Sequence, residues 1–236
     1  MRVLVTRAAD EAVRTREMLA AAGHDVVLSP VIEIVATRAE WPDGVVDAVL
    51  ATSAQAFAIL DDAFGPAPEA RRLMPLYVVG ERTAERARAR GFVGPTAIAP
   101  SATALALRFG KLAHRPLRLV YLAGRDRKPD VETALEVTGH DTQILVVYEA
   151  AAAAALADAA VRALRTNAVD AVLHFSRRSA SLFCNLADAG GVDLAGPRHL
   201  CLSDDVADPL RQRGLPYVEV AGAPNEAALL ERLDQA

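Results

Sequence analysis

The chain has 236 residues, a length that allows one large domain or two modest ones. Hydrophobic residues make up 52% of it and charged residues 24%, so it can bury a core and stay soluble. The net charge of −4 gives no support to a nucleic-acid-binding protein. The apolar run after Met1 is too short for a signal peptide and no run has transmembrane length, so we expect a cytoplasmic protein.

Short apolar runs alternate with helix-like stretches along the whole chain. The predicted strands are 3–5, 26–28, 46–50, 76–79, 97–99, 117–122, 144–148, 170–175, 199–202 and 217–220. Predicted helices between them include 54–62, 83–90, 101–112, 130–137, 177–189, 204–213 and 225–234. This alternation predicts an α/β fold with parallel sheets.

Two stretches depart from the alternation. Pro30 begins a segment, 30–36, that we interpret as an extended connector, and Tyr148–Glu149, at the end of the strand 144–148, opens a return crossing. The run Ala150–Ala155 has high helix propensity, so we expect a helix to start there.

The sequence also repeats itself. Val46–Leu50 recurs residue for residue as Val169–Leu173, at an offset of 169 − 46 = 123, and a serine follows three places later both times. The triplet Gly23–Asp25 recurs as Gly139–Asp141, at an offset of 139 − 23 = 116. Several matches in the same order predict an internal duplication into two similar parallel-sheet α/β halves.

Hydroxyl, glycine and basic residues follow the carboxyl ends of the predicted strands, where ligands bind in open parallel sheets. They are Thr6, Arg7, Thr52, Ser53, Gly80, Thr83, Gly124 to Lys128, Ser176, and Ser203 to Asp205. Helix N-termini at these positions favour anions through free N–H groups and the helix dipole. Two such domains facing each other predict a cleft for an anionic ligand. The alternative, that each Ser or Thr is only a helix N-cap, stays open.

Familiar catalytic motifs are absent from the sequence, which has no P-loop, no dinucleotide fingerprint after a strand, no nucleophile elbow and no Cys/His metal set. His174 has no obvious carboxylate partner, so we interpret it as a packed or surface histidine and not as a catalytic base. Cys184 and Cys201 lie in apolar contexts without metal spacing, which indicates buried free thiols. The residues alone therefore predict a cleft for an anion, and they do not indicate which reaction, if any, takes place there.

Eight short segments add a resemblance. They are Leu4–Arg7, Pro30–Ile32, Ala51–Ser53, Val79–Ala84, Leu122–Gly124, Val147–Glu149, Phe175–Ser176 and Ala223–Pro224. In this order and spacing, over nearly the whole chain, they resemble the uroporphyrinogen-III synthase family, cofactor-free cyclases of tetrapyrrole synthesis. The resemblance implies two α/β domains joined by a two-stranded connector, with strands at 30–36 and 144–150. The first domain would hold 1–35 and 149–236, and the second, 36–148, would be inserted into it.

The family's reaction is implied in the same way. Its substrate is hydroxymethylbilane, a linear tetrapyrrole with eight carboxylates, which suits a cleft of hydroxyls, N–H groups and bases. Loss of the hydroxyl gives an azafulvene cation, ring D is attacked at its substituted carbon, and a spiro intermediate fragments and recloses as uroporphyrinogen III. The enzyme's main contribution is to position a flexible chain. The resemblance implies a cytoplasmic monomer in heme biosynthesis, with no metal or cofactor.

Individual roles also come from matching positions. Tyr148 is expected to help the substrate's hydroxyl depart, because a phenol can donate a proton or a hydrogen bond. The expected substrate contacts are Thr6, Arg7, Ser53, Thr83, Lys128 and Ser176. The basic loop after the strand 117–122 adds Arg127 to them, beside Lys128.

One loop departs from the family pattern. Ser203 stands in place of a glycine and Val206 in place of a threonine, and Asp204–Asp205 add negative charge where a polyanion should bind; Arg177 and Arg178 supply positive charge nearby. Two rival functions stay open. One is a degenerate, non-catalytic family member that binds a ligand or regulates, and the other is a two-lobed small-anion binding protein that shares only the architecture.

Overall fold

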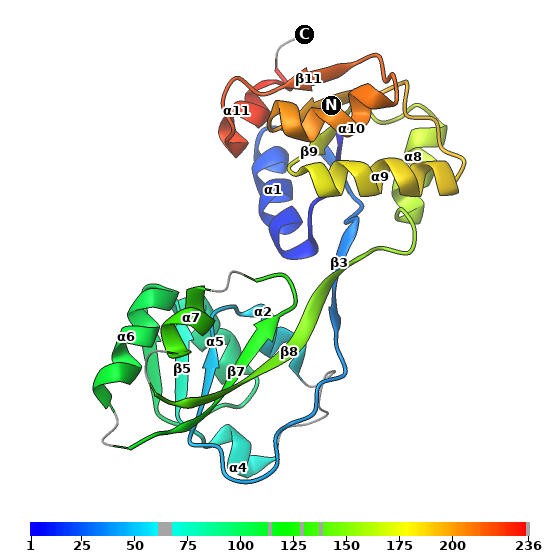
Figure 1. Ribbon diagram of the computed structural model, residues 1–236. Helices are drawn as coiled ribbons and strands as arrows, with labels where there is room; N and C mark the ends of the chain where they lie inside the picture. The colour runs from blue at the N-terminus through cyan, green and yellow to red at the C-terminus, as the bar shows by residue number, and fades with distance from the viewer. Residues whose placement is uncertain (61–67, 113–114, 128–129, 137–138, 235–236) are drawn as a thin grey trace. The chain divides into compact units, whose positions relative to one another are not determined.

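The structure is a computed structural model that describes residues 1–60, 68–112, 115–127, 130–136 and 139–234 (Figure 1). The chain divides into two compact units, which we call unit 1 (Met1–Glu33 with Ala151–Ala236) and unit 2 (Ile34–Ala150). Both are mixed α/β structures with mainly parallel strands, so the predicted fold class is confirmed. That the units move as separate domains stays a prediction. Among the described residues, no helix combines the length and apolar character that crossing a membrane requires.

Unit 1 contains a five-stranded parallel sheet in the order β11-β10-β9-β1-β2. The strands are β1 (Arg2–Val5), β2 (Asp25–Leu28), β9 (Ala171–His174), β10 (Arg198–Cys201) and β11 (Val218–Val220). Successive strand residues point to opposite faces, so Val3 and Val5 pack under α1 (Ala9–Ala21) and α11 (Glu226–Glu231). Leu4 lies on the other face, in a core covered by α8 (Asp158–Arg165), α9 (Arg177–Ala189) and α10 (Asp204–Gln212).

Unit 2 contains the second sheet, in the order β3-β8-β7-β4-β5-β6. Its strands are β3 (Ile32–Ala36), β4 (Ala48–Ala51), β5 (Leu76–Val79), β6 (Thr96–Ala99), β7 (Arg118–Gly124) and β8 (Asp141–Ala152). Short α2 (Gln55–Ala58) and α5 (Glu81–Ala89) cover one face, and α6 (Ala102–Leu112) and α7 (Asp130–Glu136) cover the other. The single-turn helix α4 (Glu69–Arg72) was not predicted.

The strand β3 is the antiparallel member of this sheet. The Thr37 amide donates to the Val147 carbonyl at 3.1 Å, and the Ala153 amide donates to the Val31 carbonyl at 3.0 Å. From the first bond to the second, the residue number falls along β3 and rises along β8, so the two strands are antiparallel. The connector predicted at 30–36 and 144–150 is therefore a hydrogen-bonded pair of strands, which carries the chain out of unit 1 and back.

The two sheets have the same strand order when β4 to β8 are matched with β9, β10, β11, β1 and β2. Their registers correspond as well. Val49 pairs with Leu76 in unit 2, and Val172 pairs with His199 in unit 1. Adding the offset of 123 to the first two residue numbers gives the second two. Val49 also pairs with Val120, and Val172 with Leu4, which agrees with the 116-residue offset. This correspondence supports the inference of an internal duplication.

The prediction of a helix starting in Ala150–Ala155 is wrong. The strand β8 continues to Ala152, and α8 begins only at Asp158, with Ala157 as its N-cap residue. Alanine favours a helix by less than about 1 kcal/mol per residue over most other residues. Pairing with β3 and burial of the Ala153 side chain outweigh that preference.

Two buried histidines lie side by side in unit 1, and of the two alternatives predicted for His174, a packed or a surface residue, the structure shows the packed one. His174 and His199 are both 0% exposed, and His174 Nε2 lies 3.1 Å from His199 Nδ1. His199 Nε2–H donates to the Leu194 carbonyl, so His199 Nδ1 is the acceptor for His174. Burial lowers the pKa of both, and the neighbouring His199 lowers the pKa of His174 further. Both rings are therefore neutral in the folded chain.

We expect this pair to make unit 1 sensitive to acid. In the unfolded chain each histidine takes up a proton below about pH 6.5, whereas the folded chain resists protonation. The free energy of unfolding should be highest above that pH. As the pH drops below it, the free energy of unfolding should fall by up to about 1.4 kcal/mol per pH unit for each histidine. Urea unfolding at each pH measures this free energy. We choose far-UV circular dichroism to follow it, because the fluorescence of the one tryptophan, Trp41, would report on unit 2.

The decisive comparison is between His174→Leu and the wild-type chain. His174→Leu should flatten the pH dependence of the free energy of unfolding between pH 7 and 5. An equally steep loss of stability in His174→Leu would refute the role of the pair.

Candidate functional site

Each sheet has one pair of neighbouring central strands from which the strand order runs outward in both directions, and these two strands lead into helices on opposite faces. In unit 1 the pair is β1 and β9, because α1 and α9 cover different faces. In unit 2 it is β4 and β7, followed by α2 and α7. Ligands of open α/β sheets bind beyond the carboxyl ends of the strands at such a switch point. We call the loops after β1 and β9 edge 1, and the loops after β4, β5, β7 and Tyr148 of β8 edge 2.

Thr6 follows β1 and is 0% exposed. Its hydroxyl donates to the Leu173 carbonyl of β9 at 3.0 Å, and its carbonyl accepts from the Val31 amide. The side chain thus extends the β1–β9 pairing by one residue past the strand end. Its place in edge 1 agrees with the prediction, and its hydroxyl already has a protein partner.

Arg7 is held by several groups of unit 1. Its guanidinium forms ion pairs with Glu11 at 3.0 Å and with Glu226 at 2.9 Å, and it donates to the Thr15 hydroxyl at 3.1 Å. The same group lies 4.2 Å from the centre of the Phe175 ring. Only 17% of the side chain is exposed. Arg7 therefore offers an oriented cation whose charge two carboxylates already balance.

Ser176 caps α9. Its hydroxyl oxygen accepts from the Ser179 amide at 3.1 Å, which is the N-cap geometry that the sequence left open. In edge 2 the Ser53 hydroxyl accepts from the Gln55 amide at 3.2 Å, and Ser53 lies one residue before Ala54, which is the N-cap residue of α2. Both serines are partly exposed, and both occupy equivalent places at the 123-residue offset.

The acidic loop of unit 1 is balanced by arginines. Arg177 Nη1 binds Asp205 at 2.8 Å and Asp208 at 3.0 Å, and Arg211 binds Asp204 at 2.9 Å. Val206 is 4% exposed and packs into the core beneath α10. The negative charge predicted at Asp204–Asp205 is present, and the positive charge expected from Arg177 compensates part of it directly.

Thr83 and Thr52 stand at two further strand ends of edge 2. Thr83 is 4% exposed, in the first turn of α5 after Gly80, whose φ of 78° suits glycine. The Thr52 hydroxyl lies 2.9 Å from the hydroxyl of Tyr121, a residue of β7 that is 2% exposed. Burial raises the pKa of Tyr121, against the effect of the Thr52 hydrogen bond. Tyr121 is thus a neutral phenol that fixes the loop before Ser53.

The basic loop after β7 is also paired with glutamates. Arg127 binds Glu132 of α7 and donates to the Gly124 carbonyl at 3.1 Å, and Arg125 binds Glu149. The Arg127 side chain is 25% exposed. Lys128 lies outside the described residues. The loop therefore presents less free positive charge than the sequence alone indicates.

Tyr148 reaches edge 2 from β8, the neighbour of β7. Its ring packs at the margin of the core of unit 2, directly against Gly124. Tyr121 lies near enough to be affected electrostatically by Tyr148, Arg127 and Glu132. Edge 2 thus brings together Tyr148, Gly124 and Arg127, with the Thr52–Tyr121 pair close by.

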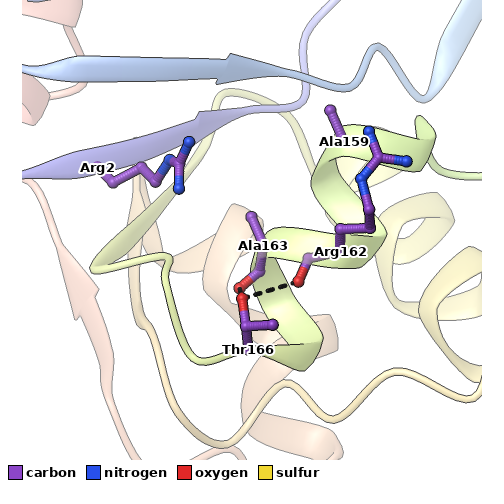
Figure 2. A pocket seen from close by; sticks show the side chains of 5 residues that line it. All are labelled: Arg2, Ala159, Arg162, Ala163 and Thr166. Atoms are coloured by element: carbon purple, nitrogen blue, oxygen red, sulfur yellow. Dashed lines mark hydrogen bonds between the residues drawn. The ribbon is translucent and has the colours of Figure 1, made fainter.

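A pocket of about 250 Å³ lies away from these residues, at the amino end of β1. Arg2, Ala159, Arg162, Ala163 and Thr166 line it. Figure 2 shows that the guanidinium groups of Arg2 and Arg162 do not converge on one point. Arg2 is moreover paired with Asp25 at 2.9 Å. Among the described residues, no group of three His, Cys, Asp or Glu side chains is placed to hold a metal ion.

Sequence reasoning missed the residues that orient the predicted ones. Glu11 lies four residues after Arg7, in the first turn of α1, whereas Arg7 precedes that helix, so their ion pair joins the loop to the helix. Glu226 and Glu132 gave no signal in the sequence, because their pairing depends on how the sheets fold. Tyr121 lies within the apolar run of β7, so no local pattern indicated that its hydroxyl contacts Thr52.

Comparison with known proteins identifies the family. The family model of uroporphyrinogen-III synthase HemD matches residues 13–231. A search of curated proteins finds no match. Among solved structures, the chain is similar to uroporphyrinogen-III synthetase from Helicobacter pylori 26695, with 20% identity, a TM-score of 0.58, and coverage of 100% of this chain and 99% of that one. A mutant uroporphyrinogen III synthase from the extremely thermophilic bacterium Thermus thermophilus gives 17% identity, a TM-score of 0.48, and coverage of 100% and 98%. Since the family model spans most of its length, the chain belongs to the uroporphyrinogen-III synthase HemD family.

Proposed function

We propose that this chain cyclises hydroxymethylbilane to uroporphyrinogen III, with inversion of ring D and loss of water, in tetrapyrrole biosynthesis. The observation that carries the proposal is membership of the synthase family over residues 13–231, together with family residues at the switch points of both sheets. The proposal includes a cytoplasmic monomer that acts on a small linear tetrapyrrole and not on nucleic acid.

Substrate binding is assigned to Arg7 and Ser176 of edge 1 and to Ser53, Thr83 and Arg127 of edge 2. Thr6 and Lys128 complete the proposed set. Ser176 begins a helix of 13 residues, whose first N–H groups and dipole attract a carboxylate. Arg7 and Arg127 each present part of a guanidinium group that a glutamate already orients. A polyanion can exchange with these glutamates for the same hydrogen-bond donors.

Tyr148 is assigned to the loss of the hydroxyl. Its phenol stands at the margin of a hydrophobic core, beside the carboxyl end of β7. There it can donate a hydrogen bond to the departing oxygen. The later steps rearrange one flexible chain, so the rest of the contribution is positioning.

The direct test is a coupled assay. Freshly made hydroxymethylbilane is supplied, the products are oxidised, and the I and III isomers are separated and measured. We expect the III isomer in excess over the isomer I that closes without enzyme. Isomer I alone, with tetrapyrrole bound, would identify the degenerate, non-catalytic member. The acidic residues Asp204 and Asp205 at the edge are the observation that makes this second candidate worth testing.

The first variant is Tyr148→Phe. It keeps the ring and removes the hydroxyl, so turnover should fall by roughly ten- to a thousandfold, about 1.4–4 kcal/mol of barrier, with little change in substrate binding. Single-turnover kinetics separate these two effects. Turnover within about twofold of wild type, with isomer III still formed, would remove Tyr148 from the chemistry.

A second pair of variants tests Arg127. Arg127→Gln should raise KM by about three- to tenfold and weaken its dependence on salt, because a substrate carboxylate loses its partner. Glu132→Gln should act in the opposite sense and lower KM, because it removes the carboxylate that competes for the same guanidinium. The matched control is Arg115→Gln, since Arg115 binds Asp47 next to the amino end of β7. If Arg127→Gln and Glu132→Gln shift KM in the same direction, Arg127 does not bind the substrate as proposed.

A further inference from the structure

Gly124 is the last residue of β7 and faces Tyr148 across the strand pair. A Cβ atom built on Gly124 would lie 2.6 Å from Tyr148 Cε2, 2.6 Å from Cζ and 2.9 Å from the hydroxyl oxygen. These distances are far below van der Waals contact. The φ of Gly124 is not in the left-handed region, so its backbone conformation does not itself require glycine. The space for the tyrosine ring is what excludes a side chain here.

A β-bulge creates this opposition. Ala123 pairs with Val146, and the next residue, Gly124, pairs with Tyr148, so Val147 is an extra residue on β8. On the other side of β8, the Thr37 amide donates to the Val147 carbonyl and the Thr37 hydroxyl donates to the Val146 carbonyl, so the residue that follows β3 binds both residues before Tyr148. Bulges next to functional sites commonly redirect one side chain. Here the residue after the bulge is Tyr148.

The strand end is fixed on both sides of the ring. The Arg125 amide donates to the Tyr148 carbonyl at 2.9 Å, which continues the pairing beyond the bulge. Arg127 Nη1 donates to the Gly124 carbonyl at 3.1 Å, and Glu132 holds that guanidinium. The backbone of Gly124 is thus anchored, and an added methyl group at this residue would meet the mobile end of the tyrosine.

We propose that Gly124, with the bulge opposite it, is the positioning residue for Tyr148: it leaves the space in which the phenol is held at edge 2. The placement of the Tyr148 ring rests on geometry alone, and the kinetic consequence rests on the proposed function. A side chain at position 124 should affect the rate more than folding or substrate affinity, because Tyr148 can rotate away from a methyl group.

Ring placement is measured first, without any activity. The chain has four tyrosines, so ring-labelled tyrosine gives few NMR signals, which Tyr→Phe variants assign. In the wild-type chain, we expect nuclear Overhauser effects between the Tyr148 ring and the Gly124 Hα protons. Gly124→Ala should shift the Tyr148 ring signals. Gly222→Ala is the matched control, because a Cβ there meets nothing within 4 Å and its φ is not left-handed.

Kinetics then test the consequence. Gly124→Ala should lower kcat by about ten- to a hundredfold, the scale of a misplacement near 1 Å, and leave KM within about threefold. The double variant Gly124→Ala, Tyr148→Phe should be no slower than Tyr148→Phe alone, since both changes remove the same hydroxyl from its place. Gly222→Ala should match the wild type in kcat, KM and melting temperature.

The outcomes separate this inference from the proposed function. A wild-type chain without synthase activity would defeat the function, and the NMR contacts would still decide ring placement. Absence of those contacts, or unmoved Tyr148 signals in Gly124→Ala, overturns the inference. So does a double variant much slower than Tyr148→Phe, because Gly124 would then act through another group. Should Gly124→Ala fail to fold, the wild-type contacts still provide a test.

Discussion

The pairing of β1 with β9 is the constraint on which unit 1 depends. It joins the beginning of the chain to a strand more than 160 residues later, and polar groups close it at both ends. The Arg2 amide donates to the Asp170 carboxylate across a separation of 168 residues, and the Thr6 hydroxyl donates to the Leu173 carbonyl. Because the helices after these two strands leave to opposite faces, the same pairing creates edge 1. The fold and the proposed binding surface therefore depend on the same set of hydrogen bonds in this unit.

Charge at both edges is balanced within the protein. Arg7 lies between Glu11 and Glu226, Arg127 binds Glu132, and Arg177 binds Asp205. An unpaired guanidinium would attract a polyanion more strongly, but it would hold it in no particular orientation. Paired arginines have fixed directions, and under the proposed function a substrate carboxylate replaces a protein carboxylate to reach them. Such exchange favours a ligand with many carboxylates over a small anion.

Local patterns predict most of the fold. The strands were predicted because runs of Val, Leu and Ala are buried on both faces of parallel sheets, and the repeated Val-Asp-Ala-Val-Leu segments mark β4 and β9 as equivalent. The alanine run was assigned wrongly, because only a distant partner strand makes it extended. The same limit applies to the candidate site. Positions at strand ends followed from the sequence, but the partners of Arg7 and Arg127 and the reason for glycine at 124 depend on contacts that no local pattern encodes.

The inserted position of unit 2 has a consequence for synthesis of the chain. Unit 2 is one continuous segment, Ile34–Ala150, and all its strand partners have been made once β8 is complete. The strands β1 and β2 are made first, yet the edge of β1 that will pair with β9 stays open until Ala171 to His174 follow. At about 5–20 residues per second that interval is on the order of ten seconds. From the completion of β8 until β9 follows, the nascent chain exposes this short apolar strand edge while unit 2 is already complete, a condition that invites chaperone binding or pairing with another chain.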